Sequence, residues 1–289
     1  MARKTVLVVG GAGGVGSAVL KRLVEGGYRV VATTLLEDEA REIERAYDGA
    51  VACHAVDLGD ADAALVALRD IVSGFGALDA VVVCAAIAPP SPMELTSLAT
   101  YRKAYEINCV SEVAVYQATL PALRRSGGRI VLMGSLAGRV AFTFMSAYGA
   151  TKFALEALCD VMRREAAPQG VKVSLIQPGA IRTNLVYQQF TAMERDLAAL
   201  GDEERDRYFY LYDAHRKVSE ASMTGNSSTP EQVAETVLTA IEAEQPKARY
   251  VVGQDAEDFF ELTRTLSDEA IDDLFRRLYS GESEVYVRR

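Results

Sequence analysis

Short apolar segments alternate with segments of helical periodicity along most of this 289-residue chain, and no other feature restricts the fold as strongly. The apolar segments are rich in β-branched residues, which is typical of parallel strands buried on both faces. The predicted strands cover residues 6–9, 29–34, 50–56, 78–85, 129–133, 171–177 and 249–252. The predicted helices cover residues 15–25, 37–47, 60–72, 94–123, 146–166 and 231–244. This order predicts a three-layer α/β domain around one doubly wound parallel sheet.

Two segments stand outside this alternation. Residues 185–229 are polar and carry no strand pattern, so they are predicted to form a helical lid over a substrate pocket, or else an ordinary surface excursion. Residues 254–289 show an amphipathic helical pattern with apolar positions such as Phe259 and Leu274. We therefore expect one catalytic domain over residues 1–253, followed by a helical C-terminal extension.

Composition excludes several classes of function. The formal net charge of −9 argues against nucleic-acid binding, which needs a basic surface. The four cysteines, at positions 53, 84, 109 and 159, have no paired spacing, and two histidines add no metal motif. Unpaired cysteines suit a reducing compartment, and no apolar stretch is long enough to span a membrane. We expect a cytoplasmic protein without a metal, membrane or nucleic-acid partner.

A cluster of glycines follows the first predicted strand and precedes the first predicted helix. The cluster holds Gly10, Gly13, Gly14 and Gly16. Without a Cβ, the backbone can approach a pyrophosphate, and the helix N-terminus offers its free N–H groups to the phosphates. The strand–glycine–helix context predicts a Rossmann-type dinucleotide site. Two glycine spacings fit equally well, Gly10-x-x-x-Gly14-x-Gly16 and Gly10-x-x-Gly13-x-x-Gly16, so the loop alone does not select a family.

A serine, a tyrosine and a lysine stand near the end of the fifth predicted strand. Ser135 follows that strand, and Tyr148 and Lys152 are four residues apart on the next helix, so they share one face. Hydride transfer to a ketone leaves an oxygen that needs a proton, and a free phenol with a pKa of about 10 is a poor base. A neighbouring ammonium favours the phenolate, which makes Tyr148 a candidate general acid and base. Ser135 would bind the substrate oxygen, and Lys152 would also bind the nicotinamide ribose.

Together these residues resemble the short-chain dehydrogenase/reductase family, in its shorter single-domain branch, over roughly residues 4–253. The resemblance implies NAD or NADP as cofactor, a small-molecule alcohol or ketone as substrate, and a homodimer or homotetramer. It implies that Ser135, Tyr148 and Lys152 are catalytic and that Asn108 anchors a proton-relay water. The residues that it assigns to cofactor binding are Gly10, Gly13, Gly14, Val15, Gly16, Thr34, Asp57, Leu58, Ala85, Tyr148, Lys152, Pro178, Gly179, Ile181 and Thr183.

One of these assignments stays open, and the chain departs from the family pattern at two places. Asp57 could contact the adenine or could simply stabilise a turn. Residues 83–86 read Val-Cys-Ala-Ala instead of Asn-Asn-Ala-Gly, so we expect a local loss of stability but not of activity. Thr34 ends the second strand, where the family carries an acid for NAD or a basic residue for NADP. The missing cation favours NAD, with Glu37 or Asp38 as the nearest acids, unless these only begin a helix.

The substrate is expected to be a hydrophobic secondary alcohol or its ketone. Residues 230–235 and 248–253 are similar to steroid- and retinol-dehydrogenase-like members of the family. Five apolar residues near the catalytic set could line a pocket or belong to the core. They are Leu136, Val140, Phe142, Phe144 and Met145.

Two other functions are compatible with parts of the pattern. A nucleotide-sugar epimerase or dehydratase of the family's extended branch shares the tyrosine and lysine, but Asn108 and the short spacing between Ser135 and Tyr148 argue against it. A non-catalytic nucleotide-sensing regulator on the same fold would not need the intact tyrosine and lysine. Fold alone does not decide between enzyme and sensor.

Overall fold

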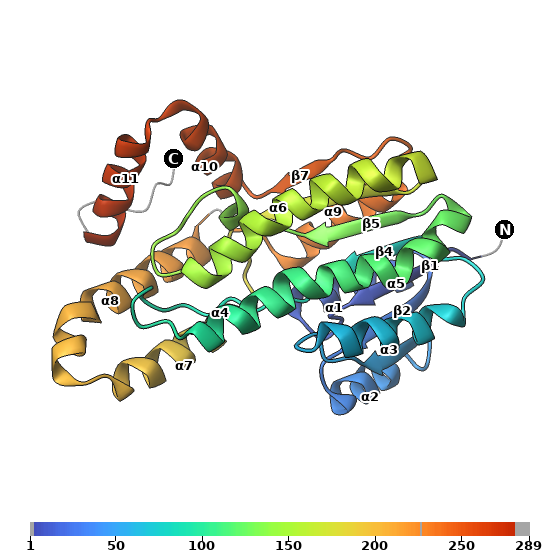
Figure 1. The fold of residues 1–289 in the computed structure, drawn as a ribbon, viewed down its shortest axis with the longest axis horizontal. Coiled ribbons are helices and arrows are strands. Elements are labelled where there is room, and N and C mark those ends of the chain that lie inside the picture. Colours follow the sequence, from blue (N-terminus) through green and yellow to red (C-terminus); the bar gives the residue numbers. More distant parts are fainter. Residues whose placement is uncertain (1–2, 226, 281–289) are drawn as a thin grey trace.

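Seven parallel strands form a single sheet in the order β3-β2-β1-β4-β5-β6-β7 (Figure 1). The computed structural model describes residues 3–225 and 227–280. The strands are β1 Thr5–Val9, β2 Arg29–Thr34, β3 Val51–Ala55, β4 Ala80–Val83, β5 Arg129–Met133, β6 Lys172–Pro178 and β7 Arg249–Val252. The strand order reverses between β1 and β4, which confirms the predicted doubly wound sheet and places a crevice at the carboxyl ends of these strands.

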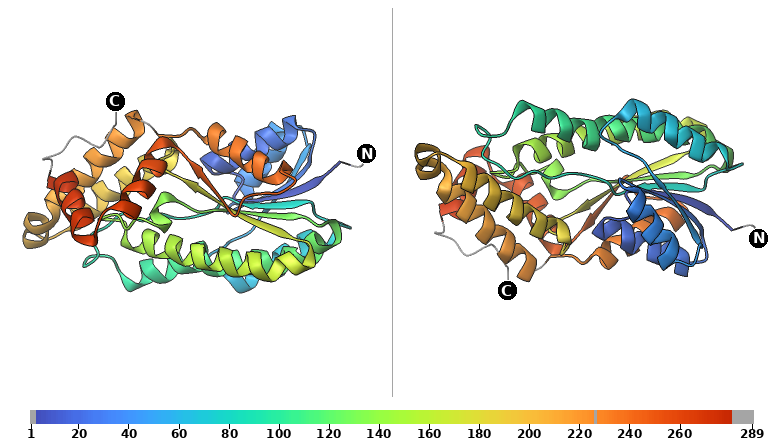
Figure 2. Two further views of the ribbon diagram at one scale, coloured as in Figure 1. Left: turned by 90° about the horizontal axis from the view of Figure 1, so that it is seen from above. Right: turned by 90° about the horizontal axis from the view of Figure 1, so that it is seen from below.

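Helices cover both faces of the sheet (Figure 2). One face carries α1 Gly14–Glu25, α2 Glu37–Ala46 and α9 Pro230–Glu242, and the other carries α3 Ala61–Ser73, α5 Ser111–Ser126 and α6 Ser146–Ala166. Successive side chains of a strand point to opposite faces. Accordingly, Val6 and Val8 pack into the cluster with α1 and α9, whereas Leu7 and Val9 pack into the cluster with α3, α5 and α6. Two cores of buried aliphatic residues therefore enclose the sheet.

The prediction of a single helix over residues 94–123 was wrong in its detail. The segment contains α4 Leu98–Tyr105, a π-helical turn over Glu106–Val110, and then α5. The side chain of Ser97 accepts the N–H of Thr100 at 3.0 Å, so the helix starts at Leu98. A π turn inserts one residue into the helix and is frequent at functional sites; here it contains Asn108.

Four helices lie beyond the carboxyl ends of the strands, at one end of the molecule (Figure 1). They are α7 Asn184–Ala199, α8 Asp202–Thr224, α10 Gln254–Thr265 and α11 Asp268–Ser280. A third cluster of buried residues joins them to the segment after β5. It consists of Leu136, Val140, Phe144, Met193, Tyr212, Ala214, Ala256, Phe275 and Tyr279. Residues 281–289 of the predicted extension lie outside the described residues, as do residues 1–2 and 226.

Within residues 3–225 and 227–280, no helix is both long enough and apolar enough to cross a lipid bilayer. Over the same ranges, no three His, Cys, Asp or Glu side chains gather as metal ligands. The four cysteines are free thiols.

Candidate active site

A cavity of about 1330 Å³ opens at the carboxyl edge of the sheet. Its inner wall is the glycine loop together with the strand ends, and its outer wall comes from α7, α8, α10 and α11. Doubly wound sheets bind ligands at this edge. The predicted site residues that line the cavity are Gly10, Gly13, Gly14, Val15, Gly16, Thr34, Asp57, Leu58, Ala85, Ser135, Tyr148, Lys152, Pro178, Gly179, Ile181 and Thr183. Asn108 is the one predicted site residue that does not line it.

The glycine loop is shaped by close approaches of the backbone. Gly10 has a φ of +86°, and a Cβ there would lie 2.7 Å from the backbone nitrogen of Ala85. A Cβ on Gly16 would collide with the carbonyl oxygen of Gly10, and one on Gly14 would lie 2.9 Å from Thr183. No side chain caps the N-terminus of α1 at Gly13, so the N–H groups of its first turn are available to an anion in the cavity. The loop therefore fits the pyrophosphate of a dinucleotide.

Asp57 lines the cavity and also stabilises a turn. Its Oδ1 accepts the N–H of Gly59 at 2.7 Å, while the residue lines the cavity beside Leu58. The turn that we considered as an alternative is therefore present, and the second carboxylate oxygen is left to interact with a ligand.

An acid that follows β2 and lines the cavity is Glu39, which the sequence analysis missed. Glu39 lines the cavity, and its Oε2 accepts the N–H of Leu36 at 3.2 Å. The acids named from the sequence, Glu37 and Asp38, do not line the cavity and pair with Arg41. The helix explains the position of the Glu39 side chain. Glu39 is the third residue of α2, and an acid at that position reaches back to the N-terminus of its own helix.

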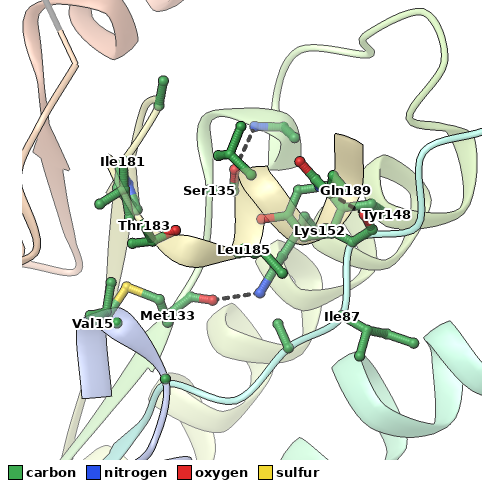
Figure 3. Close-up of a pocket in the computed structure, with 18 of the residues that line it drawn as sticks. Val15, Ile87, Met133, Ser135, Tyr148, Lys152, Ile181, Thr183, Leu185 and Gln189 are labelled. Atoms are coloured by element: carbon green, nitrogen blue, oxygen red, sulfur yellow. Dashed lines mark hydrogen bonds between the residues drawn. The ribbon is translucent and has the colours of Figure 1, made fainter. Parts of the chain in front are cut away.

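Ser135, Tyr148 and Lys152 share one wall of the cavity (Figure 3). Ser135 follows β5, and its Oγ accepts the N–H of Ala137 at 3.1 Å. Lys152 is 1% exposed, and its Nζ donates to the carbonyl oxygen of Met133 at 2.7 Å. That Nζ lies 5.7 Å from the centroid of the Tyr148 ring. The end of β5 thus holds the lysine, and the lysine lies beside the phenol.

Asn108 lies behind this wall, fully buried in the π turn. Its Oδ1 accepts the N–H of Ile87 at 2.9 Å, and its Nδ2 donates to the carbonyl oxygen of Ile87 at 2.8 Å. Nδ2 also lies 3.0 Å from the hydroxyl oxygen of Thr151. The amide therefore ties the loop after β4 to α6, next to Lys152. These bonds occupy the side chain of Asn108, so only its backbone could hold a water. The water-anchoring role implied by the resemblance stays a prediction.

The turn after β6 is held from the C-terminal side of the chain. Pro178, Gly179, Ile181 and Thr183 line the cavity there. Asp255, in the first turn of α10, accepts the N–H of Ala180 at 2.7 Å through its Oδ2 and packs against Gly179. Burial raises the pKa of the Asp255 carboxyl above its usual range. Sequence reasoning had no signal for Asp255, because 75 residues separate it from Ala180.

The outer part of the cavity is mostly apolar. Leu136, Phe142 and Met145 line it as expected, but Val140 and Phe144 are buried in the third cluster instead. For these two side chains the structure shows the alternative that we considered, a position in the core. Further lining comes from the late helices, with Phe259, Leu262, Leu274 and Leu278.

One buried histidine faces this apolar part. His215 of α8 lines the cavity, stacks on Phe144 with ring centroids 4.8 Å apart, and has its Nδ1 3.4 Å from the Tyr279 hydroxyl. Tyr279 in turn donates to the carbonyl oxygen of Thr143 at 2.8 Å. Burial lowers the pKa of His215 to about 4, so the imidazole is neutral at physiological pH.

The sheet order, the glycine loop and the cavity define a dinucleotide-binding α/β protein. The family model described as short chain dehydrogenase matches residues 4–194. The chain therefore belongs to the short-chain dehydrogenase family, as its motifs indicated, and is an NAD(P)-dependent oxidoreductase.

Two curated proteins and one solved structure illustrate the relationship. The chain is 31% identical to the 3-amino-tetrahydro-pyrrolizinone reductase of Xenorhabdus hominickii, with 98% of this chain and 99% of the relative covered. It is 31% identical to human 17-beta-hydroxysteroid dehydrogenase type 1, over 93% of this chain and 82% of the relative. The structure of a short-chain dehydrogenase from Streptomyces avermitilis superposes with a TM-score of 0.77 at 26% identity, covering 98% of both chains.

Proposed function

We propose that this enzyme interconverts a hydrophobic secondary alcohol and its ketone, with Tyr148 as the general acid and base. The observation that carries the proposal is that Ser135, Tyr148 and Lys152 line the same cavity as the glycine loop. A phosphate group at the loop and a reacting carbon at the tyrosine can therefore belong to one bound complex. The alternatives of a nucleotide-sugar enzyme or a sensor gain no support from any particular contact.

The roles of the three side chains follow from their contacts. A bound nicotinamide supplies or accepts the hydride. Tyr148 gives a proton to the substrate oxygen during reduction and takes it back during oxidation. Ser135 Oγ accepts the N–H of Ala137, which leaves its own hydrogen to donate to the substrate oxygen. Lys152 uses one of its three donors on Met133, which leaves two for ribose hydroxyls, and its Nζ lies 5.7 Å from the centroid of the Tyr148 ring.

The substrate class is inferred from the outer part of the cavity. Its lining of Leu, Phe and Met side chains favours an apolar compound, with the neutral His215 and Tyr279 as local polar contacts. One relative is named for a hydroxysteroid and another for a pyrrolizinone, which supports a ring-containing substrate. In this proposal α7 and α8 form the lid over the catalytic domain, and the extension from residue 254 completes the pocket. A panel of secondary alcohols and polar sugars tests the class, and turnover of sugars alone would overturn it.

NAD is the cofactor that we propose. Glu39 is the carboxylate that lines the cavity near Thr34, where it can accept hydrogen bonds from an adenosine ribose and would repel a 2′-phosphate. Steady-state kinetics with NAD and NADP test this choice. We expect NAD to be preferred and Glu39→Gln to narrow the difference, and a clear preference of the wild-type enzyme for NADP would contradict it.

The central test is turnover by the wild-type enzyme and by Tyr148→Phe. Loss of a positioned general acid and base is expected to lower kcat about 10²- to 10⁴-fold. Dinucleotide binding, measured by fluorescence titration, should stay within a few-fold of wild type, because the glycine loop is untouched. If the wild-type protein turned over neither alcohols nor ketones, a sensor would become the better interpretation. If Tyr148→Phe kept its activity, the acid–base assignment would be wrong.

We also propose a cytoplasmic homodimer or homotetramer. Several large apolar side chains are exposed along α4, the π turn and α6, which we propose as the interface. They are Leu98, Tyr105, Val110, Phe153 and Val161. Exposed apolar side chains that share a surface are typical of an interface. Light scattering at micromolar concentration tests this, and a monomer alone would contradict it.

A further inference from the structure

The turn after β6 is held on one side by two segments that come later in the chain. Asp255 Oδ2 accepts the N–H of Ala180 at 2.7 Å, and the carbonyl oxygen of Ser228 accepts the N–H of Arg182 at 3.1 Å. Ser228 also donates its own N–H to the carbonyl oxygen of Ala180 at 2.9 Å. On this side, the backbone groups of the turn are therefore occupied by the protein itself.

The N–H groups on the other side of the turn are left for a ligand. Successive N–H groups of an extended segment point in opposite directions, and Ile181 pairs with Ser228 as an isolated parallel bridge. The N–H groups of Ile181 and Thr183 therefore point away from Asp255 and Ser228, and the described part of the chain provides no hydrogen-bond partner for either. Both residues line the same cavity as Tyr148 (Figure 3).

The turn lies between the glycine loop and the catalytic wall. A Cβ on Gly14 would lie 2.9 Å from Thr183, so the turn packs against the glycine loop. On its other side β6 pairs with β5, the strand that precedes the catalytic serine, and Gly134 donates its N–H to the carbonyl oxygen of Ile176 at 2.8 Å. The nicotinamide end of a dinucleotide that reaches from the glycine loop to Tyr148 must therefore pass the turn.

Asp255 fits into a recess beside two glycines. A Cβ on Gly179 would collide with both of its carboxylate oxygens, and a Cβ on Gly253, which has a φ of +103°, would lie 2.5 Å from Oδ1. Oδ1 is buried and has no hydrogen-bond partner among the described residues, so Oδ2 alone makes the bond to the turn. A buried carboxyl with an unpaired oxygen lowers stability, so the bond to Ala180 is what this side chain contributes.

The sheet sets the position of Asp255. Val252 pairs with Pro178 at the ends of β7 and β6, and its carbonyl oxygen accepts the N–H of Gly179 at 2.9 Å. Asp255 follows shortly after β7, and its neighbour Ala256 is fully buried. The carboxylate and the turn that it holds are thus both attached directly to the sheet.

We propose that Asp255 is a positioning residue for the nicotinamide end of the cofactor. By holding the N–H of Ala180, it presents the N–H groups of Ile181 and Thr183 to the carboxamide oxygen, which is a hydrogen-bond acceptor. The inference rests on the proposed function, because it takes the nicotinamide to lie beside Tyr148. Without the carboxylate the turn can move, and the ring loses its alignment with the substrate carbon.

Isothermal titration calorimetry with two ligands tests this role. One ligand is the reduced dinucleotide that the wild-type enzyme binds more tightly, and the other is the corresponding ADP-ribose, which lacks the nicotinamide. Asp255→Ala should weaken binding of the dinucleotide about tenfold, the effect of losing one charge-assisted hydrogen bond. Its affinity for the ADP-ribose should stay within about twofold of wild type. Asp255→Asn keeps an acceptor oxygen for Ala180 and should restore most of the dinucleotide affinity.

Glu257→Ala is the matched control. Glu257 is an acid of the same first turn of α10, but it is exposed and does not line the cavity. Its replacement removes the same charge without touching the turn, so both affinities and kcat should stay within about twofold of wild type. At saturating cofactor, Asp255→Ala should instead lower kcat about tenfold, because a ring that is held less firmly is less often aligned for hydride transfer.

Three results would overturn the role of Asp255. They are an equal loss of affinity for both ligands in Asp255→Ala, which indicates a merely structural residue, no loss for either ligand, and a failure of Asp255→Asn to restore dinucleotide binding. Selective loss of dinucleotide affinity in Asp255→Ala, with recovery in Asp255→Asn, supports the role.

The outcomes also separate this inference from the function on which it rests. If wild type is active, Tyr148→Phe is inactive and Asp255→Ala binds both ligands like wild type, then the role of Asp255 is wrong and the proposed function stands. If Tyr148→Phe keeps its activity and Asp255→Ala loses affinity for the dinucleotide alone, then the acid–base assignment is wrong and the role of Asp255 stands.

Discussion

The two halves of the cavity are built in different ways. The cofactor half consists of loops that directly follow strands of the sheet, and its shape depends on backbone contacts such as that of Gly10 with Ala85. The substrate half consists of α7, α8, α10 and α11, whose side chains pack in a third cluster separate from the two cores of the sheet. The cofactor half therefore shares the stability of the sheet, whereas the substrate half depends on a smaller core of its own.

This difference makes the substrate half the part that can change or open without loss of the fold. Its core relies on aromatic contacts: Phe142 lies edge-on to both Phe259 and Phe275, with centroid distances of 5.4 Å in each case. Phe142 also lines the cavity, so the packing of α10 and α11 directly sets the shape of the substrate pocket.

Phe275→Ala should have the largest effect on stability, and it should destabilise only the substrate half of the cavity. Removing a buried aromatic ring costs about 4 kcal/mol, here drawn from the local stability of the C-terminal helices. We expect KM for the substrate to rise strongly and α11 to become sensitive to limited proteolysis, while the dinucleotide affinity stays within twofold. Phe209→Ala is the control, since Phe209 of α8 is 53% exposed. An equal loss of dinucleotide affinity would show that the halves are not independent.

Gly16→Ala should damage the cofactor half. Its Cβ would collide with the carbonyl oxygen of Gly10, and the resulting backbone shift should cost about 3 kcal/mol and weaken dinucleotide binding. Gly13→Ala is the matched control, because its Cβ would lie 3.6 Å from the nearest atom, an ordinary contact. Urea unfolding without cofactor measures both variants. Equal stability of the two would contradict the proposed importance of the backbone approach at Gly16.

Replacing His215 should have the smallest effect on stability. It tests how the stability of the substrate half depends on pH. Its pKa is 6.5 when exposed and about 4 when buried, so the unfolded chain binds the proton and stability is lost as pH falls from about 6.5 to 4. Between pH 7 and pH 5 this amounts to about 2 kcal/mol. His215→Asn should remove that part of the acid sensitivity, measured as Tm against pH. The exposed His54→Asn should leave it unchanged, and an unaltered profile in His215→Asn would refute the assignment.

Several features were predictable because they follow local rules. The strands have continuous β-branched runs, and the glycine cluster has its strand–helix context, so the sheet and the site of the glycine loop were predicted correctly. Tyr148 and Lys152 are one helical turn apart, so their shared face followed from helix geometry. By contrast, the π turn at Asn108 was missed, and the Asn108 side chain in it bonds to Ile87, which lies 21 residues away in another loop.

By itself, the sequence determined the order of strands and helices, the position of the glycine loop and the family to which the chain belongs. Periodicity and short spacing carry that information, because each depends on residues within a few positions of one another. Only the tertiary structure decided that Glu39 faces the cavity, that Asp255 holds the turn at Ala180 and that Glu112 is buried. Burial and long-range contact set the environment of those three carboxyls, and they arise only when distant segments pack together.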